Sequence, residues 1–316
     1  MNYFTGIDLG GTSAKIGLVD PQGRVLDSTV QKIDATAGFA EIAGAISDAL
    51  GKLVKGQRGR RPAAIGIGSP GFVDAESGIL IGGAENIPCL RGKSLTRFLE
   101  DEFRVPVSAD NDATCAAAGE LKFGSGRHFQ DFVLLTIGTG IGGGLVQNGK
   151  VYRGSRGFAA EMGHMCVSPR GRWCNCGSQG CLEQYASAPA IQRLYLEKRR
   201  KRGLLAGGTN ADVREIFKLA EKKKDTCAVD TVEEAALYIA QALGILINVL
   251  NPQACILGGG VSQAGETLLG PVRRSITDFS WPTMREGVEV LAAELANNAG
   301  LLGAAAGAMD RYGDEV

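Results

Sequence analysis

The sequence has no excess of charge of either sign, because its 34 lysine and arginine residues equal its 34 aspartate and glutamate residues. A neutral chain has no overall field that would attract nucleic acid or an anionic membrane. Basic residues do cluster at 198–202 and 222–224, but no aromatic side chains are interleaved with them. Such runs are typical of solvated helix faces, so we expect no nucleic-acid partner.

Long hydrophobic runs are scarce too. The first eight residues pass into a strand-like pattern with neither a basic start nor an apolar signal core. The most apolar helical stretch, 242–250, is interrupted by Asn248 and stops before Pro252, far short of the ~20 apolar residues that a bilayer requires. We therefore expect no membrane contact and a cytoplasmic location, where eight cysteines without a secretion signal need no disulfides.

Glycine, by contrast, is abundant, with 46 of 316 residues. The length exceeds one ordinary core of about 100–200 residues, so we expect two α/β domains. The first would hold strands at 3–9, 14–19, 25–30, 63–67 and 105–108, with helices at 39–55 and 95–103. The second would hold strands at 132–137, 142–147 and 254–257 and a helix over 235–250, introduced by a capping box of Thr231 and Glu234. A helix near 300–309 would close the chain.

Three glycine turns follow strands and lack side chains that would keep a phosphate from the backbone amides. The predicted nucleotide-binding residues are Asp8, Gly10, Gly11 and Thr12 in the first turn, Gly138, Thr139 and Gly140 in the second, and Gly258, Gly259 and Gly260 in the third. Asp8 would hold Mg²⁺. Because the first two turns return into a strand, neither the P-loop nor the dinucleotide-binding pattern fits. Their repetition in two halves favours ATP held between two related domains.

Cysteines crowd into one short segment, with Cys174, Cys176 and Cys181 on a loop containing two glycines. His164, one of only two histidines, lies ten residues upstream. Three thiolates and one imidazole form a closed tetrahedral set for a structural Zn²⁺. Cys166 is the rival fourth ligand.

Together these stretches resemble the ROK family of bacterial sugar kinases and repressors, within the actin-like or ribonuclease H-like duplicated fold. The matching segments are 8–12, 68–71, 111–113, 138–144, 161–164 and 174–183. Two positions depart from the family pattern: Ser13 stands where a lysine is usual, with Lys15 two residues on, and Asp110 stands where glutamate is common. The resemblance assigns the zinc to His164.

The resemblance implies an ATP-dependent kinase that phosphorylates a hexose, with glucose as the default sugar. Asp112 would be the general base, since an aspartate ionised at neutral pH can accept the hydroxyl proton. Helix capping is the alternative role for this stretch, supplied by Asp110 or Asn111. The sugar would be bound by Asn86, Asn111, Asp112, Glu161, His164 and Glu183.

Further expectations follow from the resemblance. The domains would comprise residues 1–112 plus 300–316 and residues 113–299, closing around a central cleft. A homodimer, or a dimer of dimers, is implied. Within the same reaction class, N-acetylmannosamine, N-acetylglucosamine, fructose, mannose and allose are alternative substrates. A sugar-sensing transcription regulator would need a DNA-binding module ahead of the first strand, for which we expect no room, and an actin-like ATPase would lack the sugar and zinc residues.

Overall fold

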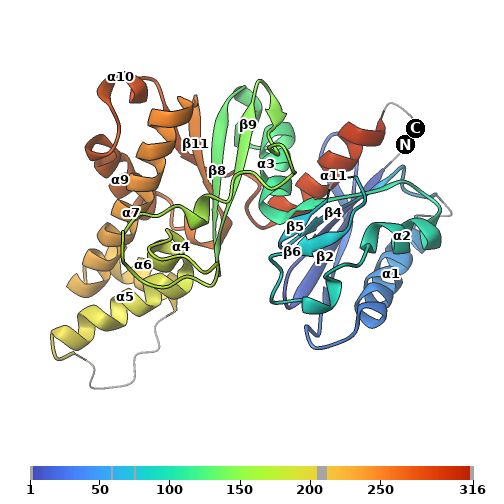
Figure 1. Cartoon of the computed structure of the whole chain (residues 1–316), viewed down its shortest axis with the longest axis horizontal. Helices are drawn as coiled ribbons and strands as arrows, with labels where there is room; N and C mark the ends of the chain where they lie inside the picture. The colour runs from blue at the N-terminus through green and yellow to red at the C-terminus, as the bar shows by residue number, and fades with distance from the viewer. Residues whose placement is uncertain (1–2, 58–59, 75, 205–211, 314–316) are drawn as a thin grey trace. The chain divides into compact units, whose positions relative to one another are not determined.

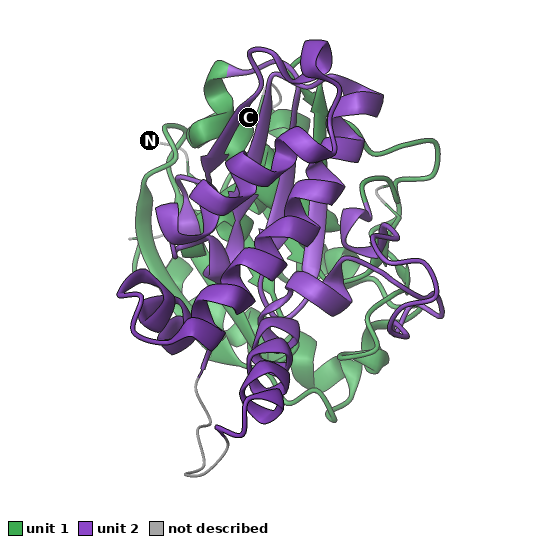
Figure 2. Ribbon diagram, turned by 90° about the vertical axis from the view of Figure 1, so that its left-hand side faces the viewer, with its two compact units in different colours: residues 1–128, 144–160, 297–316 green, residues 129–143, 161–296 purple. Residues whose placement is uncertain are grey.

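The computed structural model describes residues 3–57, 60–74, 76–204 and 212–313 (Figure 1). The chain forms two compact units, coloured separately in Figure 2. Unit 1 comprises residues 1–128, 144–160 and 297–316, and unit 2 comprises residues 129–143 and 161–296.

Unit 1 is built on a five-stranded sheet in the order β3-β2-β1-β4-β7. Its strands are β1 (Phe4–Leu9), β2 (Ser13–Val19), β3 (Val25–Lys32), β4 (Ile65–Ser69) and β7 (Val107–Asn111). β1 pairs antiparallel with β2 and parallel with β4, which pairs parallel with β7. The carboxyl ends of β1, β4 and β7 therefore meet at one edge of the sheet. A small hairpin of β5 (Phe72–Val73) and β6 (Leu80–Gly82) follows β4.

Helices cover both faces of this sheet. They are α1 (Phe39–Lys55), α2 (Leu95–Phe103), α3 (Asp112–Phe123) and α11 (Ala299–Tyr312). Successive strand side chains point to opposite faces: Ile7 and Leu9 of β1 join the apolar core formed with α1 and α2. Gly6, on the other face, lies under α11, where a Cβ would come 1.9 Å from the Leu301 carbonyl oxygen.

Unit 2 contains the parallel strands β8 (Phe132–Ile137), β11 (Ala254–Gly258) and β12 (Glu289–Ala292). The strand order of this sheet is β10-β9-β8-β11-β12, and the unit boundary falls within β9 (Ile141–Gln147), before β10 (Lys150–Val151). The helices of unit 2 are α4 (Glu183–Ala186), α5 (Ala188–Lys201), α6 (Val213–Glu221), α7 (Thr226–Leu250), α8 (Gly259–Ser262), α9 (Glu266–Ser275) and α10 (Pro282–Arg285).

The long helix α7 differs from the expectation at its start. It begins at Thr226, capped by the Asp225 carboxylate, which accepts hydrogen bonds from the amides of Cys227 and Ala228 at 2.7 and 3.2 Å. Thr231 lies inside the helix and donates its hydroxyl to the Cys227 carbonyl at 2.6 Å, so the predicted capping box was wrong. Among the described residues, α7 is the one helix long and apolar enough to span a membrane, but 56% of its most apolar window is buried. It packs on α5, α6 and α9 as a core helix.

Candidate functional site

Three carboxylates gather at the carboxyl edge of the unit 1 sheet. Asp8, the penultimate residue of β1, lies opposite Gly68 of β4, and Gly68 lies opposite Asp110 of β7. Asp112 follows as the first residue of α3. Burial raises the pKa of the Cys115 thiol well above its usual value, and the charges of Asp110, Asp112 and Asp8 raise it further. All three carboxylates therefore act electrostatically on one buried thiol.

Asn111 is the cap of α3. Its Oδ1 accepts hydrogen bonds from the amides of Ala113 and Thr114 at 2.9 and 3.1 Å, and its Nδ2 donates to the Gly71 carbonyl at 3.2 Å. The Asp112 Oδ1 also accepts from the Ala113 amide, at 2.8 Å. Asn111 is therefore the main cap of α3, as the capping alternative predicted for this stretch. The Asp112 carboxylate is held at the start of the helix by its hydrogen bond from the Ala113 amide.

The first glycine turn forms the hairpin between β1 and β2, closed by the Gly10 amide donating to the Ser13 carbonyl at 2.8 Å. A Cβ at Gly11 would lie 2.8 Å from Nδ2 of Asn86, so the Asn86 side chain lies directly against this backbone. The predicted sugar residue Asn86 is thereby brought to the predicted phosphate turn.

Asp8 lies behind that turn, against the start of α11. A Cβ at Gly300 would come within 2.7 Å of both carboxylate oxygens of Asp8. Burial raises the pKa of Asp8, and the charge of Lys15 works in the opposite direction. Lys15 donates to the Asn297 carbonyl at 3.1 Å and to Asn298 Oδ1 at 2.5 Å. A half-buried carboxylate of this kind is a suitable ligand for a hard cation such as Mg²⁺.

Arg153 was not among the predicted site residues. Its Nε donates to Asp110 Oδ2 at 2.7 Å, and the other oxygen of Asp110 accepts the Asn111 amide at 2.9 Å. Asp110 therefore connects Arg153 to the residue next to Asp112. The sequence offered one indication of such a contact. Asp110 stands where the family commonly has glutamate, and an acidic side chain near the end of a strand would require a partner.

In unit 2, Glu183 closes over the second glycine turn. One of its carboxylate oxygens accepts the Ile141 amide at 3.0 Å, and a Cβ at Gly140 would come 2.5 Å from the same oxygen. The third turn lies against the end of β8, the strand that precedes the second turn, since a Cβ at Gly259 would lie 2.4 Å from the Ile137 carbonyl oxygen. The second and third turns are thus neighbours within unit 2.

Glu161, His164 and Glu183 form a second polar group. Burial raises the pKa of Glu161; the charge of His164 lowers it, and that of Glu183 raises it. Gly163, between the first two, fits only because it has no side chain, as a Cβ there would lie 1.9 Å from the Ile141 carbonyl oxygen. The 3₁₀ turn Met162–His164 is therefore packed onto the start of β9.

The four predicted metal ligands also meet. The ligand atoms of His164, Cys174, Cys176 and Cys181 all lie within 4.8 Å of one another. Cys174 Sγ is 3.6 Å from His164 Nδ1, and Cys176 Sγ is 3.6 Å from Cys181 Sγ. Tetrahedral zinc, with bonds of about 2.3 Å to sulfur and 2.0–2.1 Å to nitrogen, separates its ligand atoms by roughly 3.5–3.8 Å. The residues therefore fit Zn²⁺.

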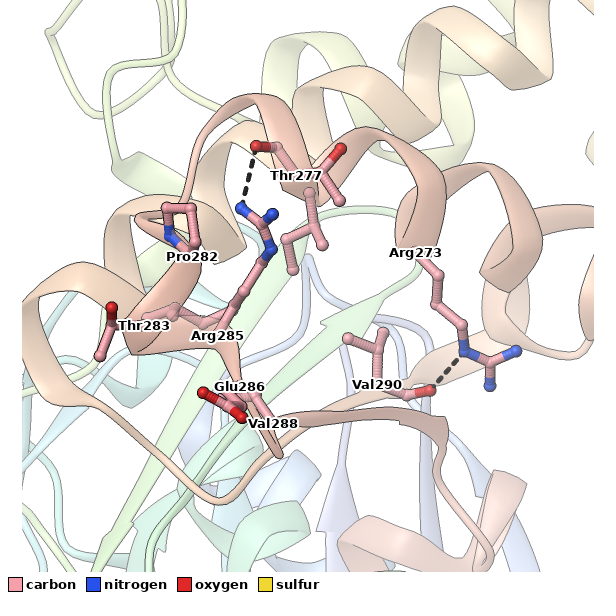
Figure 3. Close-up of a pocket in the computed structure, with 10 residues that line it drawn as sticks. Arg273, Thr277, Pro282, Thr283, Arg285, Glu286, Val288 and Val290 are labelled. Carbon is pink, nitrogen blue, oxygen red and sulfur yellow. Dashed lines mark hydrogen bonds between the residues drawn. The ribbon is translucent and has the colours of Figure 1, made fainter.

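A pocket of about 470 Å³ in unit 2 contains none of the predicted site residues (Figure 3). Its two arginines are already bonded within the protein. Arg285 donates to the Thr277 and Ser280 carbonyls, and Arg273 donates to the Val290 carbonyl and to the Glu266 carboxylate. These contacts stabilise the connection between α9 and β12.

The predicted residues divide between the two units. Unit 1 contains Asp8, Asn86, Asn111 and Asp112 with the first glycine turn. Unit 2 brings together Glu161, His164, Glu183, the three cysteines and the other two turns.

Comparison with known proteins gives consistent matches along the whole chain. The sequence pattern of the ROK family matches residues 4–311. The glucokinase of Halalkalibacterium halodurans is 37% identical over 310 residues, covering 95% of this chain and 93% of that protein. The glucokinase of Thermotoga maritima is 37% identical over 314 residues, covering 98% of each. The crystal structure of a ROK family glucokinase from Streptomyces griseus, in complex with glucose and AMPPNP, has a TM-score of 0.84 at 36% identity and covers 98% of this chain and 100% of that one.

Proposed function

Because the chain belongs to the ROK family, with the actin-like fold of its sugar kinases, we propose that it is an ATP-dependent kinase that phosphorylates glucose. The observation that carries the proposal is the position of Asp112, at the start of α3 and at the same sheet edge as Asp8. That arrangement supports a base and a cation-binding carboxylate at one place. The glucokinases that match the chain over more than nine-tenths of its length support the choice of sugar.

In this reaction the sugar hydroxyl oxygen attacks the γ-phosphorus of ATP, and the bond from that phosphorus to the bridging oxygen breaks. Asp112 accepts the hydroxyl proton as the new bond forms. The products are the sugar phosphate and ADP. Mg²⁺ would be held by Asp8 and would neutralise the phosphate charge.

Binding of the remaining hydroxyls is proposed for Asn86, Asn111, Glu161, His164 and Glu183. Asn111 already uses its acceptor oxygen for the helix cap, so its contribution to the sugar is a donor N–H. The backbone of the three glycine turns would bind the nucleotide. Because Glu183 contacts the second turn through the Ile141 amide, it connects the proposed sugar and phosphate contacts of unit 2.

Zinc at His164, Cys174, Cys176 and Cys181 would have a structural role, since four protein ligands leave no position for a water. His164 would then serve the metal through Nδ1, the atom facing Cys174, and the sugar through the other ring nitrogen. We also propose a cytoplasmic enzyme that works as a homodimer and closes its two domains, 1–112 with 300–316 and 113–299, around its substrates.

A coupled assay with Mg-ATP and a panel of sugars tests the function. The panel comprises glucose, fructose, mannose, N-acetylglucosamine and N-acetylmannosamine at equal concentrations. We expect the highest kcat/KM for glucose. A higher value for an N-acetylhexosamine would overturn the choice of sugar and leave the reaction standing, whereas intact ATP with every sugar would overturn the kinase itself.

A further inference from the structure

Cys166 lies directly opposite a proposed zinc ligand. It forms an antiparallel bridge with Cys181. The Leu182 amide donates to the Met165 carbonyl at 2.9 Å, and the Val167 amide donates to the Gly180 carbonyl at 2.9 Å. Both hydrogen bonds are made by the residues on either side of the cysteines, and none joins the cysteines themselves. The cysteines therefore form a non-hydrogen-bonded pair, the type in which facing side chains come closest.

This register suits a disulfide. Opposed residues of a non-hydrogen-bonded pair have Cα atoms about 4.5 Å apart and side chains on the same face. Disulfides form between Cα atoms about 4.4–6.8 Å apart. The Cys166 sulfur also lies close to the residue that precedes Cys181, since a Cβ at Gly180 would lie 3.1 Å from Cys166 Sγ.

The two thiols differ in access to solvent. Cys181 is fully buried, whereas Cys166 is exposed. The four atoms facing one another in the proposed zinc site belong to His164, Cys174, Cys176 and Cys181. Cys166 is therefore an exposed thiol outside the proposed ligand set, and it lies opposite the ligand Cys181. Its exposure allows an oxidant to reach it.

We propose that Cys166 and Cys181 are a peroxide-sensitive pair whose disulfide removes one ligand from the zinc site. The inference rests on the proposed zinc site. Hydrogen peroxide first oxidises one sulfur to a sulfenic acid, and the second sulfur then displaces its oxygen. Overall, the Cys166 thiol, the Cys181 thiolate, one peroxide and one proton yield one disulfide and two waters. Each sulfur loses one electron, and peroxide is the species reduced.

Loss of the Cys181 thiolate leaves the metal with His164 and two cysteines. Zinc binding then weakens, and the loop that carries Glu161 and Glu183 loses its fixed geometry. Peroxide would in this way raise the KM for the sugar, and a dithiol with added zinc would restore it.

Peptide mapping tests the pairing directly. Trypsin places Cys166 in the peptide 157–170 and the three cysteines of the proposed zinc site in the peptide 173–193. Zinc-loaded protein is treated with hydrogen peroxide, blocked with an alkylating agent and digested without reductant, while a chromogenic chelator records released zinc. We expect the two peptides to become joined, with fragmentation placing the bond on Cys181, in step with zinc release. Dithiothreitol should separate them.

Cys166→Ser is the informative variant, and Cys89→Ser, which removes a half-buried thiol of unit 1, is the matched control. Zinc release should be several-fold slower in Cys166→Ser and unchanged in Cys89→Ser. The switch is overturned if oxidation stays within peptide 173–193 or if Cys166→Ser releases zinc at the wild-type rate. Protein that holds no zinc when purified would overturn the metal site instead, and the same digest would still decide the pairing.

Discussion

At the scale of single residues, the proposed chemistry depends on two neighbouring side chains with different roles, Asn111 as the helix cap and Asp112 as the proposed base. Asn111 supplies the helix cap through its side-chain oxygen, and Asp112 stands one position further on. Because Asn111 carries most of the cap, and an asparagine at position 112 would keep an oxygen for the Ala113 amide, the charge of Asp112 can be removed with little change in the stability of α3.

Asp112→Asn should therefore retain the fold and lower kcat by about 10²–10⁴-fold, the usual contribution of a positioned general base. The assay is glucose phosphorylation with Mg-ATP, with the melting temperature and zinc content measured on the same sample. Asp34→Asn, an exposed aspartate of the same unit, is the control. Turnover near the wild-type rate in Asp112→Asn would remove this residue from the mechanism.

Arg153→Met should lower kcat about tenfold with little change in the KM for glucose, because a lost charge-assisted hydrogen bond of about 1.5–3 kcal/mol is enough for such a factor. The physical reason is that Arg153 holds Asp110, which in turn binds the Asn111 amide. Adding Asp110→Asn to Arg153→Met should cost little more than either change alone.

The ion pair of Arg24 with Asp20, at 2.6 Å, offers a matched control outside the site. Arg24→Met should leave kcat unchanged. Fully additive effects of Arg153→Met and Asp110→Asn would contradict the proposed coupling.

The sequence predicted Asp112 and could not predict Arg153, for a physical reason. Asp112 follows a strand and starts a helix, so pattern and motif both identify it. Arg153 lies 43 residues from its partner in a stretch without regular structure, where no periodicity marks a side chain as paired. Contacts of that kind are created by the fold.

At the scale of secondary structure, most elements follow from local patterns. The helix over 39–55 has the predicted bounds, and strand β8 likewise covers 132–137. The start of α7 was missed because Thr231 and Glu234 match a capping box, while Asp225, an equally good cap, lies six residues earlier. Where two cap sequences compete in one stretch, packing decides where the helix begins. Cys227 and Ala228 are buried as part of the helix, which favours the start at Asp225.

The cap of α7 should make stability depend on pH. Burial opposes ionisation of Asp225, but hydrogen bonds from Tyr195 and from the Ala228 and Cys227 amides, with the charge of Arg199, leave its pKa below the usual value. A lowered folded-state pKa stabilises the protein above the unfolded value, about 3.9, and that contribution disappears as pH falls through the folded value.

Asp225→Asn keeps a capping oxygen and removes the charge. We expect its melting temperature to be below that of the wild type at pH 7 and the gap to narrow on acidification toward pH 3. A gap that is independent of pH would contradict the role of the charge.

Close approach between α11 and the first sheet gives a prediction at the same scale. A Cβ at Gly66 would lie 1.8 Å from the Ala304 carbonyl oxygen, whereas nothing lies within 4 Å of a Cβ at Gly307 in the same helix. Gly66→Ala should destabilise unit 1 by about 3 kcal/mol or more, because backbone has to move. Gly307→Ala should be neutral or stabilise by up to about 1 kcal/mol. Urea unfolding measures both, and equal midpoints would refute the packing argument.

At the scale of the whole molecule, the two-part α/β organisation was accessible from the sequence because glycine turns recur at strand ends in both halves. The family was accessible because six motifs, from 8–12 to 174–183, resemble it in order and spacing. The predicted boundary after residue 112 stays a prediction. The division into compact units places α3 in unit 1. A compact unit is not the same as a domain that moves independently, and the predicted boundary concerns domain movement.

Removal of zinc should affect the molecule through its sugar affinity. The proposed metal holds the segment between Glu161 and Glu183, so chelator-treated protein should show a higher KM for glucose with kcat less affected, and added zinc should restore the KM. Metal analysis has to verify the loss. An unchanged KM in verified metal-free protein would contradict the structural role.

The contact of the last helix with the first strand has a consequence for biosynthesis. Gly6 and Gly66 lie against α11, and Asp8 lies against Gly300. A ribosome delivers α11 only after all of unit 2, so β1 and β4 must wait for residues 299–312 with the face that α11 covers still exposed. Chaperone dependence during translation should accordingly concentrate on the amino-terminal strands, and a stop codon before residue 299 should leave them the first substrate for proteolysis.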